Sequence, residues 1–447
     1  MFIARCKILS FFNLTLVQNR ESHKKEKISN KRGLLVLSPL IVFIGLYLGI
    51  SLASGDFYGV PISALFLIAC IYAIIVCGGL PLARRMETFS RGAGSQNMML
   101  MLWIFMLAGA FAHSAKEMGC IDATVNLTLH LLSDGWLLAG LFVAACFISL
   151  SIGTSVGTIV ALTPIAVGLA DATNASVPLI TAVVVGGAFF GDNLSFISDT
   201  TIVATTTQGC KMNDKFKTNL RIVLPAAIIV FILYAFKGAN IQSPTQLTDI
   251  QFIRIIPYLA VLVVALAGMN VMAVLTIGLA LTGIIGISLG AFNLFGWLAS
   301  IGAGIQDMGE LIIVTLLAGG LLEIVRSQGG IDYVIEKLTA HVHGKRGAEM
   351  SIGMLVALVD VCTANNTVAI ITVGDIAKQI GDRYGVDKRK CASILDTFSC
   401  SVQGLLPYGA QLLAAASLAS ITPFELIPYL YYPVAIGIAA IISILIK

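Results

Sequence analysis

The sequence predicts an all-α polytopic membrane protein built from two inverted-topology repeats with broken or re-entrant helices. Apolar runs long enough to cross roughly 30 Å of hydrocarbon recur along the whole chain. Short sequence fragments of the first half return in the second half at a nearly constant offset. Basic residues also change sides between equivalent loops, which indicates that the two halves cross the bilayer in opposite directions.

Composition excludes the two or three soluble domains that 447 residues would otherwise allow. Hydrophobic residues make up 57% of the chain and charged residues only 12%, as in helices that lie in lipid. The net charge of +4 is small and its basic residues lie in loops and the N-terminal tail, so nucleic acid is not an expected partner. The nine cysteines are scattered without a CxxC pair, so no disulfide framework, zinc site or cofactor is predicted.

The chain divides into a tail, two repeats and a linker. Residues 1–33 carry eight basic residues against two acidic ones, which predicts a largely disordered cytoplasmic tail that lies on anionic lipid. The first inverted transmembrane repeat is expected at 34–237, the linker at 238–253 and the second repeat at 254–447. Each repeat contains seven apolar segments, an odd number that itself inverts the second repeat.

Four matches support the repeat. Three of them share an offset of 210 residues and the fourth an offset of 209. A register held within one residue across all four is hard to obtain by accident. The matched sets are Gly92–Gln96 with Gly302–Gln306, Leu107–Ala110 with Leu317–Gly320, Gly119–Asp122 with Gly329–Asp332, and Thr154, Thr158 and Thr163 with Thr363, Thr367 and Thr372.

Equivalent loops differ in charge in a consistent sense. In each of four pairs one loop is basic, while its partner is acidic or lacks basic residues. By the positive-inside rule the repeats face opposite ways, both termini are cytoplasmic, and the protein lies in the cell membrane. The basic loops and their partners are 84–97 with 289–308, 326–347 with 116–135, 378–390 with 171–177, and 208–221 with 417–426.

The stretch Gly186–Thr207 (GGAFFGDNLSFISDTTIVATTT) places two carboxylates at membrane depth. On a continuous helix Asp192, Ser195 and Asp199 would share one face. An ionised Asp in hydrocarbon costs roughly 2.5–3.5 kcal/mol or more unless it is paired or hydrated, so the two indicate an ion path. The alternative is a protonated, hydrogen-bonded Asp in a packed bundle. A helix break is expected just before this face, at Gly186, Gly187 and Gly191.

Two matched stretches rich in Gly, Thr and Asn predict breaks in both repeats, Ser151–Thr158 and Asp360–Thr367. Within them Thr154–Thr158 and Thr363–Thr367 are expected to be non-helical tips that approach each other near the midplane. Backbone carbonyl groups and polar side chains in these tips would supply oxygen ligands for Na⁺. Asp192 and Asp199 are expected to be the main ligands of this ion. The predicted cation- or substrate-binding residues are Asp192, Asn193, Ser195, Ser198, Asp199, Thr200, Thr154, Ser155, Thr158, Asn365, Asn366 and Thr367.

Three other polar residues, Asp360, His113 and Glu323, are candidates for proton-linked or gating groups. His113 and Glu323 occupy equivalent positions at the 210 offset, and an equally good interpretation places them at the membrane interface near segment ends. No Ser/His/Asp or P-loop arrangement is present in the sequence, so an enzyme is not expected.

The sequence GGAFFGDNLSFISDTTIVATTTQGC is similar to the signature region of NhaC-type Na⁺/H⁺ antiporters, in the ion-transporter superfamily of inverted-repeat carriers. The stretches GTSVGT and TANNT fit the same family, and the resemblance covers roughly 34–447. It implies secondary active transport, in which Na⁺ and H⁺ compete for one carboxylate site by alternating access.

The family also contains carriers similar to malate/lactate exchangers and amino-acid transporters. A Na⁺-coupled transporter or exchanger of a small carboxylate or amino acid is therefore the alternative. The expected partners are Na⁺, H⁺ and the lipid bilayer, with a small organic solute in the alternative, and a homodimer is compatible with the sequence. A passive channel is disfavoured, because inverted repeats with paired helix breaks suit alternating access.

Overall fold

The computed structural model describes residues 29–54, 61–76, 81–131, 135–195, 198–241, 251–267, 269–339 and 344–446. Regular structure in these ranges is entirely helical, which confirms the predicted fold class. The predicted tail lies outside the described residues up to residue 28, and residues 30–33 already belong to the first described helix. Most of the predicted linker, residues 242–250, also lies outside them.

The helices of the first half begin and end as follows: α2 (Asn30–Ser54), α3 (Ile62–Val76), α4 (Leu82–Ala93), α5 (Gln96–Glu117), α6 (Cys120–Leu131), α7 (Leu137–Ile152), α8 (Ser155–Thr173), α9 (Val177–Leu194), α10 (Asp199–Gln208) and α11 (Met212–Gly238). Those of the second half are α12 (Phe252–Leu266), α13 (Val271–Ser288), α14 (Leu294–Asp307), α15 (Gly309–Ser327), α16 (Gly330–Thr339), α17 (Gly344–Thr363), α18 (Asn366–Tyr384), α19 (Lys388–Gln403), α20 (Ala410–Leu418), α21 (Pro423–Leu426), the 3-10 helix η1 (Ile427–Tyr429) and α22 (Tyr431–Leu445).

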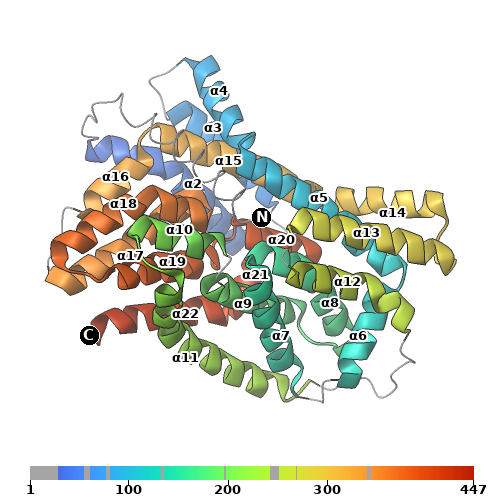
Figure 1. Ribbon diagram of the computed structural model, residues 1–447. Coiled ribbons are helices and arrows are strands. Elements are labelled where there is room, and N and C mark those ends of the chain that lie inside the picture. Colours follow the sequence, from blue (N-terminus) through green and yellow to red (C-terminus); the bar gives the residue numbers. More distant parts are fainter. Residues whose placement is uncertain are drawn as a thin grey trace.

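Helices of the first half pack against helices of the second half in reciprocal pairs. By sequence offset α4 corresponds to α14 and α5 to α15, and in the structure α4 packs on α15 while α14 packs on α5. Likewise α10 packs on α18 and α20 packs on α8. Figure 1 shows α4, α5 and α15 across the top of the view, α11 and α22 along the bottom, and α9 in the centre. The architecture therefore contains the repeat that the sequence matches predict.

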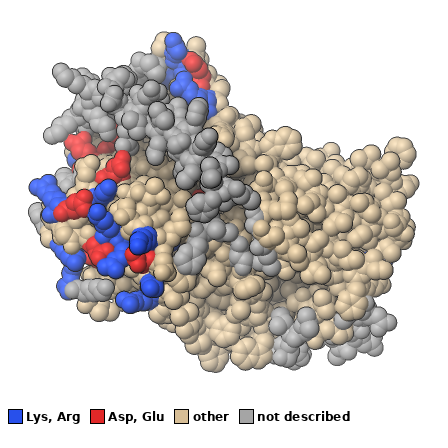
Figure 2. Space-filling model, in the orientation of Figure 1, with Lys and Arg blue, Asp and Glu red and all other residues tan. Residues whose placement is uncertain are grey.

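The surface is that of a membrane protein. Six helices in the described ranges are long and apolar enough to span a bilayer, or up to eight if each of two bent pairs counts as one span. The seven apolar segments expected per repeat are therefore not all straight spans. Large side chains such as Phe236 (75% exposed) and Phe295 (80% exposed) lie on the outside, as in helices that face lipid. In Figure 2 the charged side chains gather over the ends of α16, α17 and α18 and on α4, and leave most of this face without charge.

The break predicted at three glycines of α9 is wrong, because α9 is continuous from Val177 to Leu194. Gly187 and Gly191 instead let α9 pack closely against α7. A Cβ on Gly191 would lie 2.3 Å from the backbone nitrogen of Leu150, and one on Gly187 would lie 2.5 Å from the Cβ of Ala145. The break comes just after α9, where Ser195 is extended and α10 begins at Asp199.

Gly191→Ala is therefore expected to destabilise the protein by about 1–3 kcal/mol, because the added methyl meets the backbone of α7, which cannot move aside. The matched control is Gly302→Ala on α14, where a Cβ would have no heavy atom within 4 Å. Thermal unfolding of both purified variants in one detergent measures the difference. Equal stability of the two would show that α7 and α9 separate more easily than their packing indicates.

Candidate functional site

Helix breaks occur in both repeats where the sequence predicts them, but they are short. Gly153 is left-handed (φ 74°) at the end of α7, and Thr154 is extended at the start of α8. In the second repeat Ala364 is left-handed (φ 47°), and Asn365 caps α18 by accepting a hydrogen bond from the Val368 amide at 2.9 Å. Each break therefore covers two residues. The Asn365 side chain caps the helix that follows it, whereas the Thr154 side chain makes no capping hydrogen bond. The five-residue non-helical tips are wrong.

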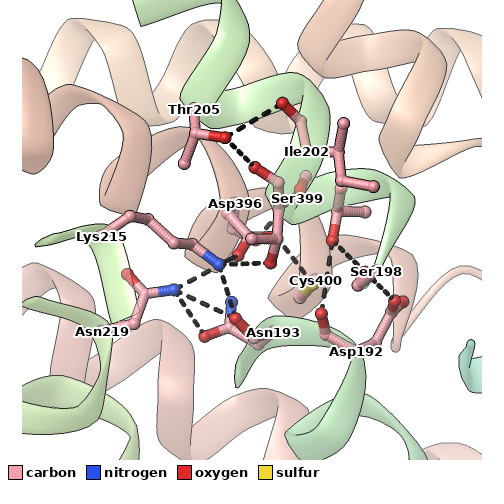
Figure 3. Close-up of polar contacts among 12 residues, drawn as sticks. Asp192, Asn193, Ser198, Ile202, Thr205, Lys215, Asn219, Asp396, Ser399 and Cys400 are labelled. Carbon is pink, nitrogen blue, oxygen red and sulfur yellow. Dashed lines mark hydrogen bonds and ion pairs between the residues drawn. The ribbon is translucent and has the colours of Figure 1, made fainter. Parts of the chain in front are cut away.

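Three broken segments meet at the carboxylate of Asp192, in the last turn of α9. Ser198, from the α9–α10 break, donates to Oδ1 at 2.6 Å (Figure 3). Ser155, at the first position of α8, donates to Oδ2 at 2.9 Å, and Asn366 of α18 donates to the same oxygen at 3.4 Å. Thr200 Oγ1 lies 2.8 Å from Ser198 Oγ and 3.4 Å from the Asp192 carbonyl oxygen. Asp192 is 5% exposed, so both repeats enclose it.

A second polar cluster lies beside it and contains a buried ion pair. Lys215 of α11 pairs with Asp396 of α19, and the two side chains are 1% and 0% exposed. The Lys215 ammonium also donates to the carbonyl oxygen of Asn193 at 2.6 Å and to Thr201 Oγ1 at 2.7 Å. Asn219, one turn further along α11, donates to Asn193 Oδ1 at 2.9 Å and to Asp396 Oδ2 at 3.2 Å. The cluster thus joins the two repeats at the end of α9 (Figure 3).

The two clusters are contiguous. Cys400 Sγ lies 3.6 Å from Asp396 Oδ1 and 3.9 Å from the side-chain nitrogen of Asn366, which also reaches Asp192. Two carboxylates and one ammonium therefore share one buried region. If all three are ionised, the region carries one net negative charge, which one monovalent cation or one proton neutralises.

The other predicted ligands are distributed unevenly. Ser195 and Thr158 are buried, and Thr158 Oγ1 donates to the Thr154 carbonyl oxygen at 3.0 Å. Asp199 is exposed, at the first position of α10. The common face predicted for Asp192, Ser195 and Asp199 is wrong, because the helix ends between them. Thr367 follows the second break, with its amide hydrogen-bonded to Asn366 Oδ1 at 3.0 Å.

The candidate proton-linked groups lie in different surroundings. Asp360, in the last turn of α17, is 0% exposed. His113 lies near the end of α5, with Nδ1 3.3 Å from an oxygen of Asp307. Glu323 pairs with Arg326 at 3.5 Å near the end of α15. Both lie in the last two turns of their helices among other charges, which favours the interface interpretation for them.

Sequence reasoning missed Lys215 and Asn219 as site residues, because it assigned them to a basic loop at 208–221. Most of that range is the start of α11. A signal was present: the two residues are four apart and so share a helix face. Asp396 also lies in the largely apolar stretch 391–416 of the sequence, where a carboxylate needs a partner.

The chain is similar to several proteins that are named as antiporters. The chain is 22% identical over 443 residues to the Malate-2H(+)/Na(+)-lactate antiporter of Bacillus subtilis, covering 91% of this chain and 94% of the relative. It is 24% identical over 386 residues to the Na(+)/H(+) antiporter NhaC of the same organism, covering 79% and 84%. The NhaC antiporter of Alkalihalophilus pseudofirmus is 24% identical over 372 residues, covering 74% and 78%.

Among solved structures, the Alcanivorax borkumensis YdaH transporter matches 86% of this chain and 97% of its own, with 13% identity and a TM-score of 0.43. The sequence model described as the Na⁺/H⁺ antiporter family matches residues 22–239 and 243–446. These two ranges include both repeats, all three helix breaks and every residue of the two polar clusters. The chain belongs to the Na⁺/H⁺ antiporter family.

Proposed function

We propose that this protein exchanges Na⁺ for H⁺ across the cell membrane at a single site around Asp192. The observation that carries the proposal is a buried carboxylate held by donors from three helix breaks. A hydroxyl group is both donor and acceptor, so Ser155, Ser198 and Thr200 can turn their lone pairs to a cation that replaces their hydrogen bonds. The carboxylate binds either Na⁺ or a proton, so each ion displaces the other.

Alternating access is supported by where the ligands come from. Ser155 and Ser198 belong to the first repeat and Asn366 to the second, so a movement between the repeats changes the shell around Asp192. The site lies at the ends of helices, where backbone carbonyls are free of helical partners and can complete a cation shell. Opening to either side of the membrane then exposes the same carboxylate to water.

Charge balance supports the same mechanism. Lys215 pairs with Asp396 within the protein, which leaves Asp192 as the carboxylate whose charge an external cation must compensate. An empty, ionised site is costly in a low-dielectric interior. The protein therefore changes conformation more readily with Na⁺ or H⁺ bound than with the site empty. This preference couples the transport of one ion to the transport of the other.

The test is exchange in proteoliposomes that contain only the purified protein. An outward Na⁺ gradient should acidify the lumen, and removing the gradient should stop the pH change. Omission of Na⁺, or replacement by K⁺, provides the control. If the internal pH does not respond to Na⁺ from either side, Na⁺/H⁺ exchange is excluded.

A second candidate is exchange or Na⁺-coupled transport of a small carboxylate. It rests on the similarity to the Malate-2H(+)/Na(+)-lactate antiporter, which extends over 91% of this chain. Half-helix N-termini at the two breaks are suited to an anionic group. Counter-flow of labelled malate, lactate and amino acids in the same proteoliposomes distinguishes the candidates, because uptake that requires an internal unlabelled solute identifies an organic substrate.

For the orientation, we propose that both termini and the loops 208–221 and 378–390 are cytoplasmic. Cys210, in the half-buried turn between α10 and α11, offers a direct test. A membrane-impermeant maleimide should label a variant with Cys210 as its sole cysteine only from inside the cell. Burial raises the pKa of the Cys210 thiol, so labelling should be slow near neutral pH and rise as pH rises.

The matched control for Cys210 replaces it with Ser and introduces Ala175→Cys, in the 171–177 loop that the charge pattern assigns to the outer face. This variant should be labelled from outside intact cells. Labelling of both cysteines from the same side would contradict the proposed orientation.

A further inference from the structure

A groove of about 720 Å³ lies between α11, the start of α19 and α22. The rings of Tyr234 and Tyr431 are 5.8 Å apart, so the end of α11 meets the start of α22 and the two helices run in opposite directions. At the other end of the groove, the ammonium of Lys390 on α19 donates to Ser443 Oγ on α22 at 2.7 Å. The groove therefore runs along the two helices from this end, which lies on the face that the loop charges assign to the cytoplasm.

Positive charge is concentrated at that end of the groove. Arg221, Arg389 and Lys390 line it, and Asp387 is its acidic lining residue. The Arg389 side chain donates to both Asp387 oxygens, at 3.0 and 2.7 Å, so this carboxylate is neutralised within the protein. Arg221 is exposed, and among the described residues it forms no ion pair. Three basic residues against one acidic residue leave two net positive charges at the edge of the membrane.

The rest of the groove is apolar and open to lipid. Its walls include Ile222, Ala226 and Ile229 of α11 and Ile438, Ala439 and Ile442 of α22. Ile229 is 64% exposed and Ile438 is 53% exposed, so the walls face outwards. The stretch from Arg221 to Ile229 is about 12 Å long at a helical rise of 1.5 Å per residue, close to the roughly 15 Å of hydrocarbon in one leaflet. The groove thus has a charged head and an apolar length that match a single phospholipid.

A second groove on the same helix lacks the charged end. It lies between α7 and α11, has a volume of about 330 Å³ and is lined by residues such as Phe142, Val143, Leu224 and Ile228, with no charged residue in its lining. Apolar walls alone are expected wherever a helix faces lipid. The groove beside α22 differs from this background through its basic residues, and these call for an anionic ligand.

We propose that the groove between α11 and α22 binds one anionic phospholipid of the cytoplasmic leaflet, with its phosphate at Arg221, Arg389 and Lys390. A guanidinium has five N–H donors, so Arg389 can hold Asp387 and still donate to a phosphate oxygen. An anionic headgroup balances the two net positive charges, whereas the choline of a zwitterionic lipid would add another. Basic pockets between helices on the cytoplasmic side are suited to such headgroups. This inference is independent of which ions the protein transports.

A lipid in this groove would connect the two repeats. Arg221 belongs to α11 of the first repeat, while Arg389 and Lys390 belong to α19 of the second. The same two helices carry the buried pair of Lys215 and Asp396. The bound lipid is therefore expected to hold α11 against α19 and to raise the thermal stability of the folded protein.

The experiment measures lipid binding to the purified full chain by native mass spectrometry, with dioleoyl phosphatidylglycerol and dioleoyl phosphatidylcholine as probes. Wild type should retain one phosphatidylglycerol with a preference over phosphatidylcholine on the order of tenfold. Arg221→Gln should weaken phosphatidylglycerol binding about fivefold, which is the attraction that one basic residue supplies near an anionic lipid. Lys388→Gln removes the same charge from an exposed position outside the groove and should behave as wild type.

A second pair of variants tests the shape of the groove without changing its charge. Ala439→Trp fills the space between α11 and α22, so the preference for phosphatidylglycerol should disappear. Val143→Trp places the same side chain in the uncharged groove beside α7 and should leave the preference intact. Thermal unfolding should agree: added phosphatidylglycerol raises the midpoint for wild type and for Val143→Trp, but not for Ala439→Trp. Arg221→Gln changes only an exposed side chain, so it keeps the test decisive if Ala439→Trp does not fold.

Three results would overturn the proposal. Equal affinity of wild type for the two lipids would show that the basic end does not select a headgroup. Equal losses in Arg221→Gln and Lys388→Gln would assign the preference to general surface charge. A lipid-free dimer that Ala439→Trp converts to a monomer would identify the groove as an interface between two copies of the chain.

Discussion

Asp192→Asn is expected to abolish Na⁺/H⁺ exchange while leaving the protein folded and inserted. Asn keeps the shape and one oxygen of the side chain but has no charge and no exchangeable proton. Removing one partner of a buried charge pair costs about 3–5 kcal/mol, so Na⁺ affinity should fall by a factor on the order of a hundred to several thousand. Isothermal titration of the purified variant with Na⁺, beside proteoliposome exchange, measures both losses.

The matched control is Asp199→Asn, which makes the same chemical change seven residues along the chain. Asp199 is exposed at the start of α10, so its loss should reduce exchange far less than the loss of Asp192. Ser198→Ala removes the shortest donor to Asp192 and should give an intermediate loss of Na⁺ affinity. If Asp192→Asn transports at the wild-type rate with unchanged pH dependence, the carboxylate is structural and the proposed site is wrong.

Lys215→Met is expected to destabilise the folded protein by about 3–5 kcal/mol, since it leaves Asp396 buried without its counter-charge. The methionine fills a similar volume, so the loss reports mainly on charge. Asp396→Asn should cost a similar amount, because it leaves the ammonium unpaired. Unfolding of each variant in one detergent, followed by near-UV circular dichroism, measures the loss.

The double variant Lys215→Met with Asp396→Asn separates pairing from packing. Its stability should exceed that of either single variant, because no unpaired charge remains. Lys217→Met, at an exposed position two residues away, is the control and should be close to neutral. Additive losses in the double variant would show that the two side chains do not act as a pair.

Much of the fold could be predicted because its determinants are local or periodic. Long apolar runs indicate spans by their length, and the offset between Gly92 and Gly302 indicates the repeat without any contact being known. The breaks at Thr154 and Asn365 were predictable for the same reason, since small and capping residues gather there. Their extent was not, because a new helix begins directly after Thr154 and Asn365, and the residue types alone do not show where it starts.

The glycines of α9 show why composition alone misleads. A glycine lowers helix propensity, yet in a packed membrane bundle it also lets two backbones approach. Gly191 serves this second role against α7, and only the neighbouring helix decides between the two. The Lys215–Asp396 pair was not predicted for a similar reason. Its two residues are far apart in the sequence and are brought together only by the packing of α11 on α19.

The Lys215–Asp396 pair also has a consequence for biogenesis. The first half of the chain leaves the ribosome with Lys215 already present, while its carboxylate partner on α19 is still to be translated. A lone charge in the bilayer costs roughly 2.5–3.5 kcal/mol on insertion scales, so we expect the start of α11 to stay at the aqueous surface until α19 arrives. Closure of α11 against α19 is then a late step of assembly. We expect a chain truncated before Asp396 to keep this helix end exposed at the aqueous surface.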